Sequence, residues 1–210
     1  MMLIKEAKEI VGGLSAPSKM PGPAFNLPTT ACIVGSKLRD VKGSTCEGCY
    51  AHERGRYRFS NVKNALNRRL SKLRDPRWIE AMTVLINGRH WQKPKPHFRW
   101  HDAGDLQGAW HLKNIFEVCT RTPDTAHWLP TREAPLLRLM DPDVVPKNLK
   151  IVLSDHMNDQ AVHPSWWPFT SGVSTTHQPV TCPASTQGNK CRDCRMCWDR
   201  GTKRVIYGKH

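Results

Sequence analysis

The sequence predicts an α/β fold, in the form of a small or partial TIM-like barrel with a cysteine-rich, metal-binding C-terminal tail. Strand-like segments at 97–101, 126–130 and 149–153 alternate with segments of helical periodicity. These units recur roughly every 25 residues, so the 210-residue chain accommodates about five or six of them. A complete eight-unit barrel typically needs ~250 residues. An open doubly wound sheet is the alternative arrangement.

The composition is that of a globular protein. Hydrophobic residues make up 39% of the chain, which disfavours a wholly disordered protein. No run approaches the ~18 apolar residues that would span a bilayer. Charged residues from Lys5 to Glu9 stand where a signal peptide has its apolar core. We therefore expect a cytoplasmic protein that has no membrane partner.

The chain is expected to form a single domain, 1–210, with three parts. Residues 1–30 contain four prolines and several glycines, and they predict an N-terminal arm or a draped loop. Residues 31–181 predict the α/β barrel-like core, which begins with a short strand at Ala31–Val34. Residues 182–210 contain four of the eight cysteines and predict a tail that folds around metal.

Two helices are predicted before the first strand of the repeating pattern. One follows Ser60, with Leu66, Leu70 and Leu73 on its apolar stripe. The second starts at Asp75, which is a favourable N-cap residue, with Pro76 at the first helical position.

The remaining elements follow in βα order. A strand at 97–101 runs into the turn sequence Asp102–Asp105, and a helix follows over roughly 108–119. Further segments predict strands at 126–130, 149–153 and 170–176, and a helix at 133–140.

The tail cysteines have the spacing of a cluster ligand set. Cys191, Cys194 and Cys197 form C-x2-C-x2-C, and Cys182 is a remote fourth cysteine that is followed by proline. Bacterial ferredoxins use such a run to bind iron–sulfur clusters. The sequence therefore predicts a [4Fe–4S] cluster, with zinc as the alternative because four-cysteine zinc sites also use C-x2-C.

A second set of cysteines lies near the N-terminus. Cys46 and Cys49 form C-x2-C, and Cys32 lies upstream. They are the second choice for metal ligands. Their spacing is compatible with four roles: ligands of one metal site shared with the tail, ligands of a second cluster, a zinc-binding pair, or a redox disulfide. Cys119 lies on the apolar face of a predicted helix and is expected in the core.

Several blocks resemble the gene product 88-like family of phage proteins. The similarity covers roughly residues 30–200, and the resemblance implies a viral protein of the host cytoplasm with a barrel-like α/β fold and an iron–sulfur cluster. The family is also distantly similar to radical S-adenosylmethionine enzymes, whose C-x3-C-x2-C triad is absent here. The blocks that carry the resemblance are Cys32–Ser36, Gly43–Ala51, Gly55–Tyr57, Phe98–Asp105, Thr131-Arg132, Cys182-Pro183 and Cys191–Trp198.

Polar residues follow the predicted strands. His101, Asp102 and Asp105 come directly after the strand at 97–101, and the carboxyl ends of parallel strands line the sites of such folds. They are our candidate catalytic residues, an acid/base histidine with two carboxylates. The structural alternative is a helix-capping Asp105 and a core His101. Thr131, Arg132, Ser154 and Asp155 would complete the rim.

The net charge of +14 indicates a polyanionic partner. Residues 54–99 contain 13 of the 32 lysines and arginines, interleaved with Tyr57, Phe59 and Trp91 as candidate base-stacking side chains. The Trp166-Trp167-Pro168-Phe169 segment is either an exposed anchor or a hydrophobic plug of the sheet.

Three functions follow from these patterns. The first is a phage-type iron–sulfur protein with a redox, radical-type or structural role. The second is a zinc-stapled nucleic-acid-binding protein without catalysis. The third is a hydrolase or transferase that uses the rim residues. The sequence does not fix the substrate or the oligomeric state.

Overall fold

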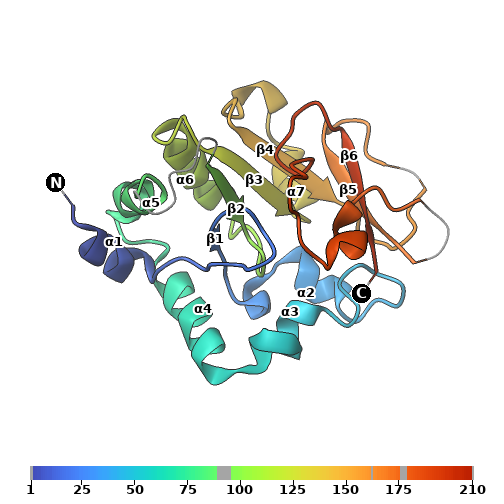
Figure 1. Ribbon diagram of the computed structural model, residues 1–210, viewed down its shortest axis with the longest axis horizontal. Coiled ribbons are helices and arrows are strands. Elements are labelled where there is room, and N and C mark those ends of the chain that lie inside the picture. The colour runs from blue at the N-terminus through green and yellow to red at the C-terminus, as the bar shows by residue number, and fades with distance from the viewer. Residues whose placement is uncertain (1, 89–95, 162, 176–178, 210) are drawn as a thin grey trace.

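A computed structural model describes residues 2–88, 96–161, 163–175 and 179–209 (Figure 1). Its six strands form one sheet in which every neighbouring pair is parallel. The spatial order is the order along the chain, β1-β2-β3-β4-β5-β6. The strands are β1 Ala24–Phe25, β2 His97–Trp100, β3 Ala126–Thr131, β4 Leu149–Ser154, β5 Thr170–Ser174 and β6 Arg204–Gly208.

The predicted parallel α/β fold is confirmed. The described strands follow one another without the reversal at which a doubly wound sheet changes direction. Sequential order of this kind is the order of strands in an α/β barrel.

The helices are gathered mostly in the long connection between β1 and β2. The helices are α1 Ile4–Val11, α2 Val34–Leu38, α3 Tyr50–Glu53, α4 Ser60–Lys72, α5 Trp78–Ile86, α6 Ala109–Thr120 and α7 Ala134–Leu137. The predicted helices after Ser60 and Asp75 are confirmed as α4 and α5. The predicted N-cap at Asp75 is wrong, because α5 begins at Trp78 after Arg77, whose backbone amide donates a 2.9 Å hydrogen bond to Asp75 Oδ1. The helix expected at 133–140 is shorter, because α7 covers only one turn.

Two predictions for the N-terminal region are wrong in part. The expected arm or loop begins with helix α1, whose Ala7, Ile10 and Val11 are buried in the main core. The strand expected at Ala31–Val34 does not form. A 3-10 turn occupies Thr29–Ala31 and α2 starts at Val34, where the backbone amide donates a hydrogen bond to Glu133 Oε1 (2.9 Å).

The tail also differs from its prediction, since its last residues form strand β6. Arg204–Gly208 pairs with β5 over five residues, and Val205 and Ile206 are buried. Residues between β5 and β6 carry the tail cysteines across the sheet.

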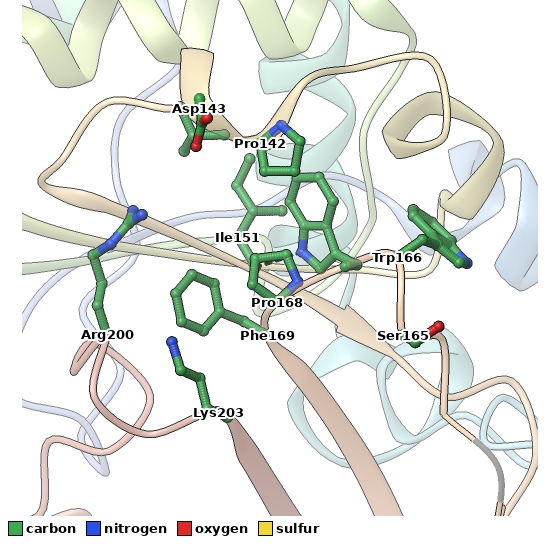
Figure 2. A pocket seen from close by; sticks show the side chains of 11 residues that line it. Pro142, Asp143, Ile151, Ser165, Trp166, Pro168, Phe169, Arg200 and Lys203 are labelled. Atoms are coloured by element: carbon green, nitrogen blue, oxygen red, sulfur yellow. Dashed lines mark hydrogen bonds between the residues drawn. The ribbon is translucent and has the colours of Figure 1, made fainter.

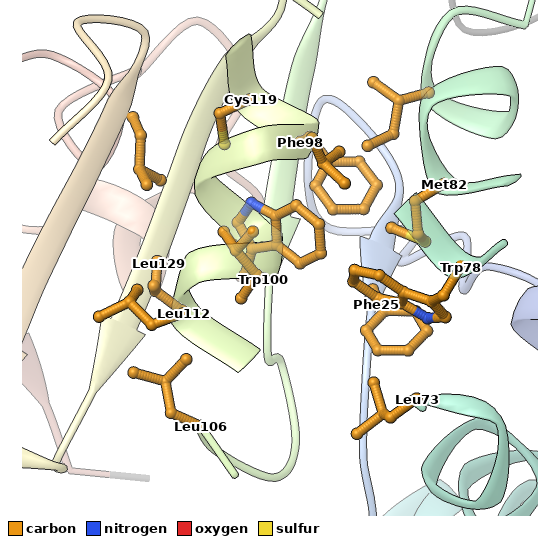
Figure 3. Packing of buried hydrophobic residues seen from close by; sticks show 14 of the residues in the cluster. Phe25, Leu73, Trp78, Met82, Phe98, Trp100, Leu106, Leu112, Cys119 and Leu129 are labelled. Carbon is orange, nitrogen blue, oxygen red and sulfur yellow. The ribbon is translucent and has the colours of Figure 1, made fainter. Parts of the chain in front are cut away.

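The main core lies on one face of the sheet. Figure 3 shows Phe98 and Trp100 of β2 against Phe25, Trp78 and residues of α5 and α6. Cys119 is fully buried in this core, as predicted. Side chains alternate along a strand, so Arg99 projects from β2 to the other face.

A smaller apolar cluster covers that second face. It consists of Trp128, Val152, Phe169 and Trp198. Trp198 follows the last tail cysteine, and its indole Nε1 donates a 2.9 Å hydrogen bond to the Phe98 carbonyl. The tail is therefore anchored against the face opposite the main core.

Candidate functional site

Asp105 is a buried carboxylate just beyond the end of β2. Its oxygens accept hydrogen bonds from Thr131 Oγ1 (2.6 Å), the Arg132 backbone amide (2.9 Å) and the Leu106 amide (2.8 Å). Burial raises the pKa of Asp105, and these hydrogen bonds oppose the shift. Asp105 thus joins the carboxyl ends of β2 and β3. Its predicted catalytic role stays a prediction.

His101 is turned into the molecule. It is 3% exposed, its ring centroid lies 5.4 Å from that of His111, and its φ of 58° is in the left-handed region. Among the described residues, neither ring nitrogen has a hydrogen-bond partner. Burial, with His111 and Arg99 nearby, holds the pKa of His101 well below its ordinary value. The imidazole is therefore neutral at pH 7.

Asp102 connects the rim to the second face of the sheet. Arg99 Nη1 lies 2.8 Å from Asp102 Oδ1, and Tyr57 donates a 2.7 Å hydrogen bond to Asp102 Oδ2. The Tyr50 hydroxyl donates to the Asp102 carbonyl (3.0 Å). His101, Asp102 and Asp105 thus have different partners, and the described contacts do not join them into one acid–base unit.

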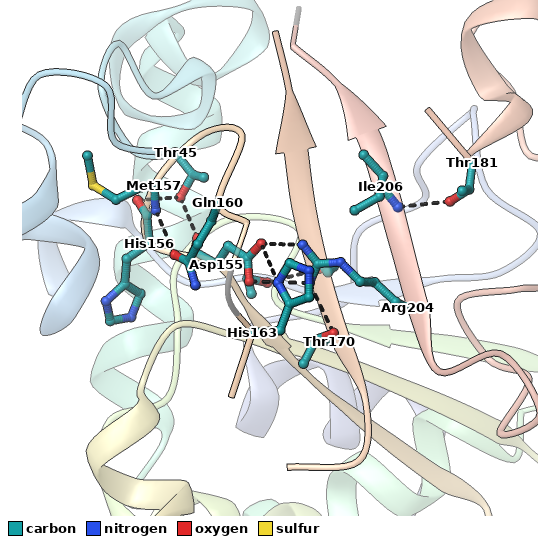
Figure 4. A network of polar contacts seen from close by, with 12 residues as sticks. Thr45, Asp155, His156, Met157, Gln160, His163, Thr170, Thr181, Arg204 and Ile206 are labelled. Carbon is teal, nitrogen blue, oxygen red and sulfur yellow. Dashed lines mark hydrogen bonds and ion pairs between the residues drawn. The ribbon is translucent and has the colours of Figure 1, made fainter. Parts of the chain in front are cut away.

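The other rim residues form a network at the end of β4 (Figure 4). Arg204 Nη2 lies 2.5 Å from Asp155 Oδ2, and His163 Nδ1 lies 3.7 Å from the same oxygen. Thr45 Oγ1 donates to the Asp155 carbonyl (2.9 Å) and accepts from Arg132 Nε (2.9 Å). This network holds the loop that carries Cys46 against the carboxyl ends of β3 and β4.

The three N-terminal cysteines are close to this network. Cys46 Sγ and Cys32 Sγ lie 3.5 and 3.7 Å from the place that a Cβ would occupy at Gly35. Burial raises the pKa of Cys32 to about 12, with further contributions from Asp105, Cys46 and Cys49. Burial also raises the pKa of Cys46, which Arg132 lowers. The absence of a side chain at Gly35 leaves space beside two of the thiols.

The four tail cysteines also gather in one place. Burial raises the pKa of Cys182 and Cys191, and the charge of Cys194 raises both further. Burial raises the pKa of Cys197 to about 11, with smaller contributions from Cys182 and Cys191. The tail thiols are therefore near enough to influence one another's pKa, and whether they form one ligand set stays a prediction.

Two side chains from the sheet face the tail thiols. Tyr207 Oη lies 3.2 Å from Cys197 Sγ. The Arg99 guanidinium lowers the pKa of both Cys191 and Cys197 and lies 4.5 Å from the centroid of the Trp128 ring. A half-buried cation next to these two thiols favours their thiolate form, which is the form that binds metal.

The spacing of the thiols bears on the kind of metal. Among the described residues, which include all eight cysteines, no three His, Cys, Asp or Glu side chains stand close enough to hold a single metal ion. A tetrahedral zinc ion with Zn–S of ~2.3 Å draws its thiolates to within about 4 Å of one another. A cubane has a separate iron atom under each thiolate and tolerates wider spacing. The described side chains therefore form no site for a single ion, and the choice between a cluster and zinc stays a prediction.

Sequence reasoning missed Arg99, Tyr207 and Gly35. Arg99 and Tyr207 belong to β2 and β6, far from the tail cysteines along the chain, so only the fold reveals their proximity. Alternation within 97–101 could have assigned Arg99 to the face opposite Phe98 and Trp100.

The basic stretch 54–99 has a mixed outcome. The Tyr57 hydroxyl donates a hydrogen bond to Asp102. Phe59 is 50% exposed, and the Arg58 guanidinium lies 5.3 Å from its ring centroid. Trp91 lies outside the described residues. Nucleic-acid contact through this stretch stays a prediction.

Comparison with known proteins gives one match. A family model described as gene product 88 matches residues 3–200. No curated protein and no solved structure gives a significant match. Within the described residues, no helix is long and apolar enough to cross a membrane.

Proposed function

The chain belongs to the gene product 88 family, and we propose that it is an iron–sulfur protein whose [4Fe–4S] cluster is bound by Cys182, Cys191, Cys194 and Cys197. The observation that carries the proposal is the C-x2-C-x2-C spacing of Cys191, Cys194 and Cys197, two of which have the Arg99 guanidinium nearby. In this proposal the sheet is a partial barrel, and the tail lies across its inner face.

The surroundings of the tail suit a negatively charged cluster. Four thiolates give the assembly a net negative charge, which the half-buried guanidinium of Arg99 offsets in part, since Arg99 also pairs with Asp102. The Tyr207 hydroxyl, 3.2 Å from Cys197 Sγ, can donate a hydrogen bond to a ligated sulfur. Hydrogen bonds to the sulfurs and burial are the means by which a protein tunes the reduction potential of a cluster.

Backbone contacts hold the ligand segment in place. The Cys191 amide donates to the Lys19 carbonyl (2.9 Å), and the Cys194 amide donates to the Cys191 carbonyl (2.9 Å). The turn between these two cysteines brings their side chains to the same region. When bound, the cluster supplies one-electron transfer, and the chain's own residues bind it, orient it and shield it from solvent.

Cys32, Cys46 and Cys49 are the second choice for metal ligands. They lie near Asp105 and Glu133, whose charges raise the pKa of Cys32. Arg132 lowers the pKa of Cys46, so each group of cysteines has an arginine nearby. The cluster is assigned to the tail because Cys191, Cys194 and Cys197 have the C-x2-C-x2-C spacing and Cys182 supplies a fourth thiol.

Cysteine variants test the assignment. The full chain is purified without oxygen, reconstituted with iron and sulfide, and its visible absorption is recorded. Thiolate-ligated iron in a cluster absorbs broadly at ~400 nm. Cys191→Ala and Cys194→Ala should lose most of this absorption. Cys119→Ala is the matched control, because Cys119 lies in the main core, and it should retain the spectrum.

A parallel Cys46→Ala/Cys49→Ala variant separates the two groups of thiols. It should retain the tail cluster. Unchanged absorption in Cys191→Ala, or equal loss in Cys119→Ala, would overturn the assignment to the tail. Zinc bound without sulfide would favour the zinc-stapled alternative instead.

A further inference from the structure

A pocket of about 350 Å³ opens at the edge of the sheet opposite to Asp105 (Figure 2). Its walls come from the segments that precede three strands: residues 142–145 before β4, 165–169 before β5, and Arg200 with Lys203 before β6. Volumes of this order hold small organic ligands, for which the usual range is about 300–1,000 Å³. The pocket contains no cysteine and is separate from the site described above.

Aromatic side chains form one wall. Trp167 is 3% exposed, and its indole Nε1 donates a 3.0 Å hydrogen bond to the Ile151 carbonyl, which fixes the segment on β4. The neighbouring Trp166 is only partly buried and lines the pocket. The segment is therefore neither a fully buried plug nor a free anchor, since Trp167 is buried whereas Trp166 packs against the main core and stays partly exposed.

Cations form the opposite wall. The charged groups of Arg200 and Lys203 lie 5.2 and 4.9 Å from the centroid of the Phe169 ring. Arg138 is not part of the pocket lining, and its guanidinium lies 4.7 Å from the centroid of Trp166. In the described part of the chain, no ion pair joins any of these three cations to a carboxylate. Arg200 Nη1 also donates a 2.7 Å hydrogen bond to the Leu149 carbonyl. Its remaining N–H groups and the Lys203 ammonium can donate to an anion in the pocket.

One acidic residue, Asp143, also lines the pocket. Its carboxylate can accept hydrogen bonds from hydroxyl or amino groups. The lining thus combines an accessible indole, cations and one acceptor. A ligand with an aromatic ring, hydroxyl groups and a phosphate complements all three.

We propose that this pocket binds a nucleoside phosphate, with its base against Trp166 and its phosphate at Lys203 and Arg200. Stacking on an aromatic side chain next to cations is how proteins hold single-stranded nucleic acids, and a nucleotide unit has the same chemistry whether it is free or at the end of a strand. The net charge of +14 raises the local concentration of such anions. The proposal is independent of the cluster.

The test measures binding of AMP and of a fluorescein-labelled single-stranded 12-mer to the full chain. Trp166→Ala should weaken the binding of whichever probe enters the pocket at least ~5-fold, because the variant loses the stacking of a base on an aromatic ring. Trp166→Phe keeps an aromatic surface and should bind nearly as tightly as the unmodified protein. Circular dichroism of each variant verifies that it is folded.

Lysine variants separate the pocket from the overall charge. Lys203→Ala should weaken binding and, for the 12-mer, lower the salt slope by about 0.7. Lys209→Ala is the matched control, because Lys209 is an exposed lysine beyond the other end of β6, and it should have little effect.

The two probes distinguish the two sources of the ligand. Competition between AMP and the 12-mer, with both sensitive to Trp166→Ala and Lys203→Ala, identifies a nucleotide pocket. If the 12-mer binds but AMP does not, and if Trp166→Ala and Lys203→Ala weaken binding of the 12-mer, the pocket is a site for the end of a strand. Equal weakening in Lys203→Ala and Lys209→Ala, insensitivity to Trp166→Ala, or no binding of either probe at low salt would overturn the proposal.

Discussion

The buried ammonium of Lys150 donates a 2.8 Å hydrogen bond to the carbonyl of Met196, a residue between two cysteines of the tail. The same Nζ also donates to the carbonyls of Asp199 and Thr202, both at 2.7 Å. All three protons of the ammonium are used, and the residue is 2% exposed. A single lysine of β4 therefore fastens the segment that follows the proposed cluster ligands.

Lys150→Met should release this segment. The variant retains most of the side-chain volume but leaves three carbonyls without their donor, and a hydrogen bond to a charged group contributes about 1.5–3 kcal/mol. We expect faster tryptic cleavage after Arg200 and Lys203 and a lower Tm. Lys147→Met, at an exposed lysine just before β4, is the control. Equal cleavage rates in the two variants would contradict the role of Lys150.

Asp105→Asn should destabilise the fold. The carboxylate accepts three hydrogen bonds, and an amide would present its NH2 group to at least one of these donors. An unsatisfied buried polar group costs about 1–3 kcal/mol. Urea denaturation should show a loss of this size. The exposed Asp124→Asn variant should be close to the unmodified protein, and a similar midpoint for both would refute the anchoring role.

Gly172→Ala should break the pair between Asp155 and Arg204. A Cβ at Gly172 would lie 2.6 Å from both Arg204 Nη2 and Asp155 Oδ2, which is too close for van der Waals contact. Overpacking of this kind costs about 1–3 kcal/mol. Gly208→Ala on β6 is matched, since its Cβ would meet only Val180 at 3.7 Å. Thermal unfolding of the two variants should differ by several degrees, and equal Tm values would disprove the steric argument.

Stability should fall in mild acid because buried histidines stay neutral in the folded protein. Burial lowers the pKa of His111 and of His127 to about 3. The unfolded chain takes up these protons below about pH 6.5, so stability decreases as the pH falls from about 6.5 toward 3. The slope reaches ~1.4 kcal/mol per pH unit for each histidine.

His111→Asn removes one of these titrating groups. In the unmodified protein the backbone amide of Gln107 donates a 3.3 Å hydrogen bond to His111 Nδ1, and the asparagine side chain retains an acceptor for it. Urea denaturation at pH 7.5 and 5.5 should therefore show a smaller loss of stability in the variant than in the unmodified protein. An identical pH dependence in the two proteins would rule out His111 as a contributor.

The sequence predicts the central strands better than the ends of the chain. The strands around Phe98, Leu129 and Ile151 have strong apolar patterns because the main core packs against them. Strand β6 was missed because Arg204–Gly208 follows the cysteine run, whose spacing predicted a tail folded around metal. Helix α1 was missed because the prolines that follow it favoured an arm or loop over the whole region.

The candidate site was predictable only in its ligands. The spacing of Cys191, Cys194 and Cys197 identifies a ligand set from local sequence alone. The orientation of His101 depends on the packing of α6 against β2, and the positions of Arg99 and Lys150 depend on the face to which each strand residue points. These are tertiary relationships that a single sequence does not contain.

The most direct test of the central claim is the iron and acid-labile sulfide content of the full chain purified without oxygen. The account predicts about four iron and about four sulfide per chain, as in a cubane cluster. A preparation with stoichiometric zinc and no sulfide would contradict it.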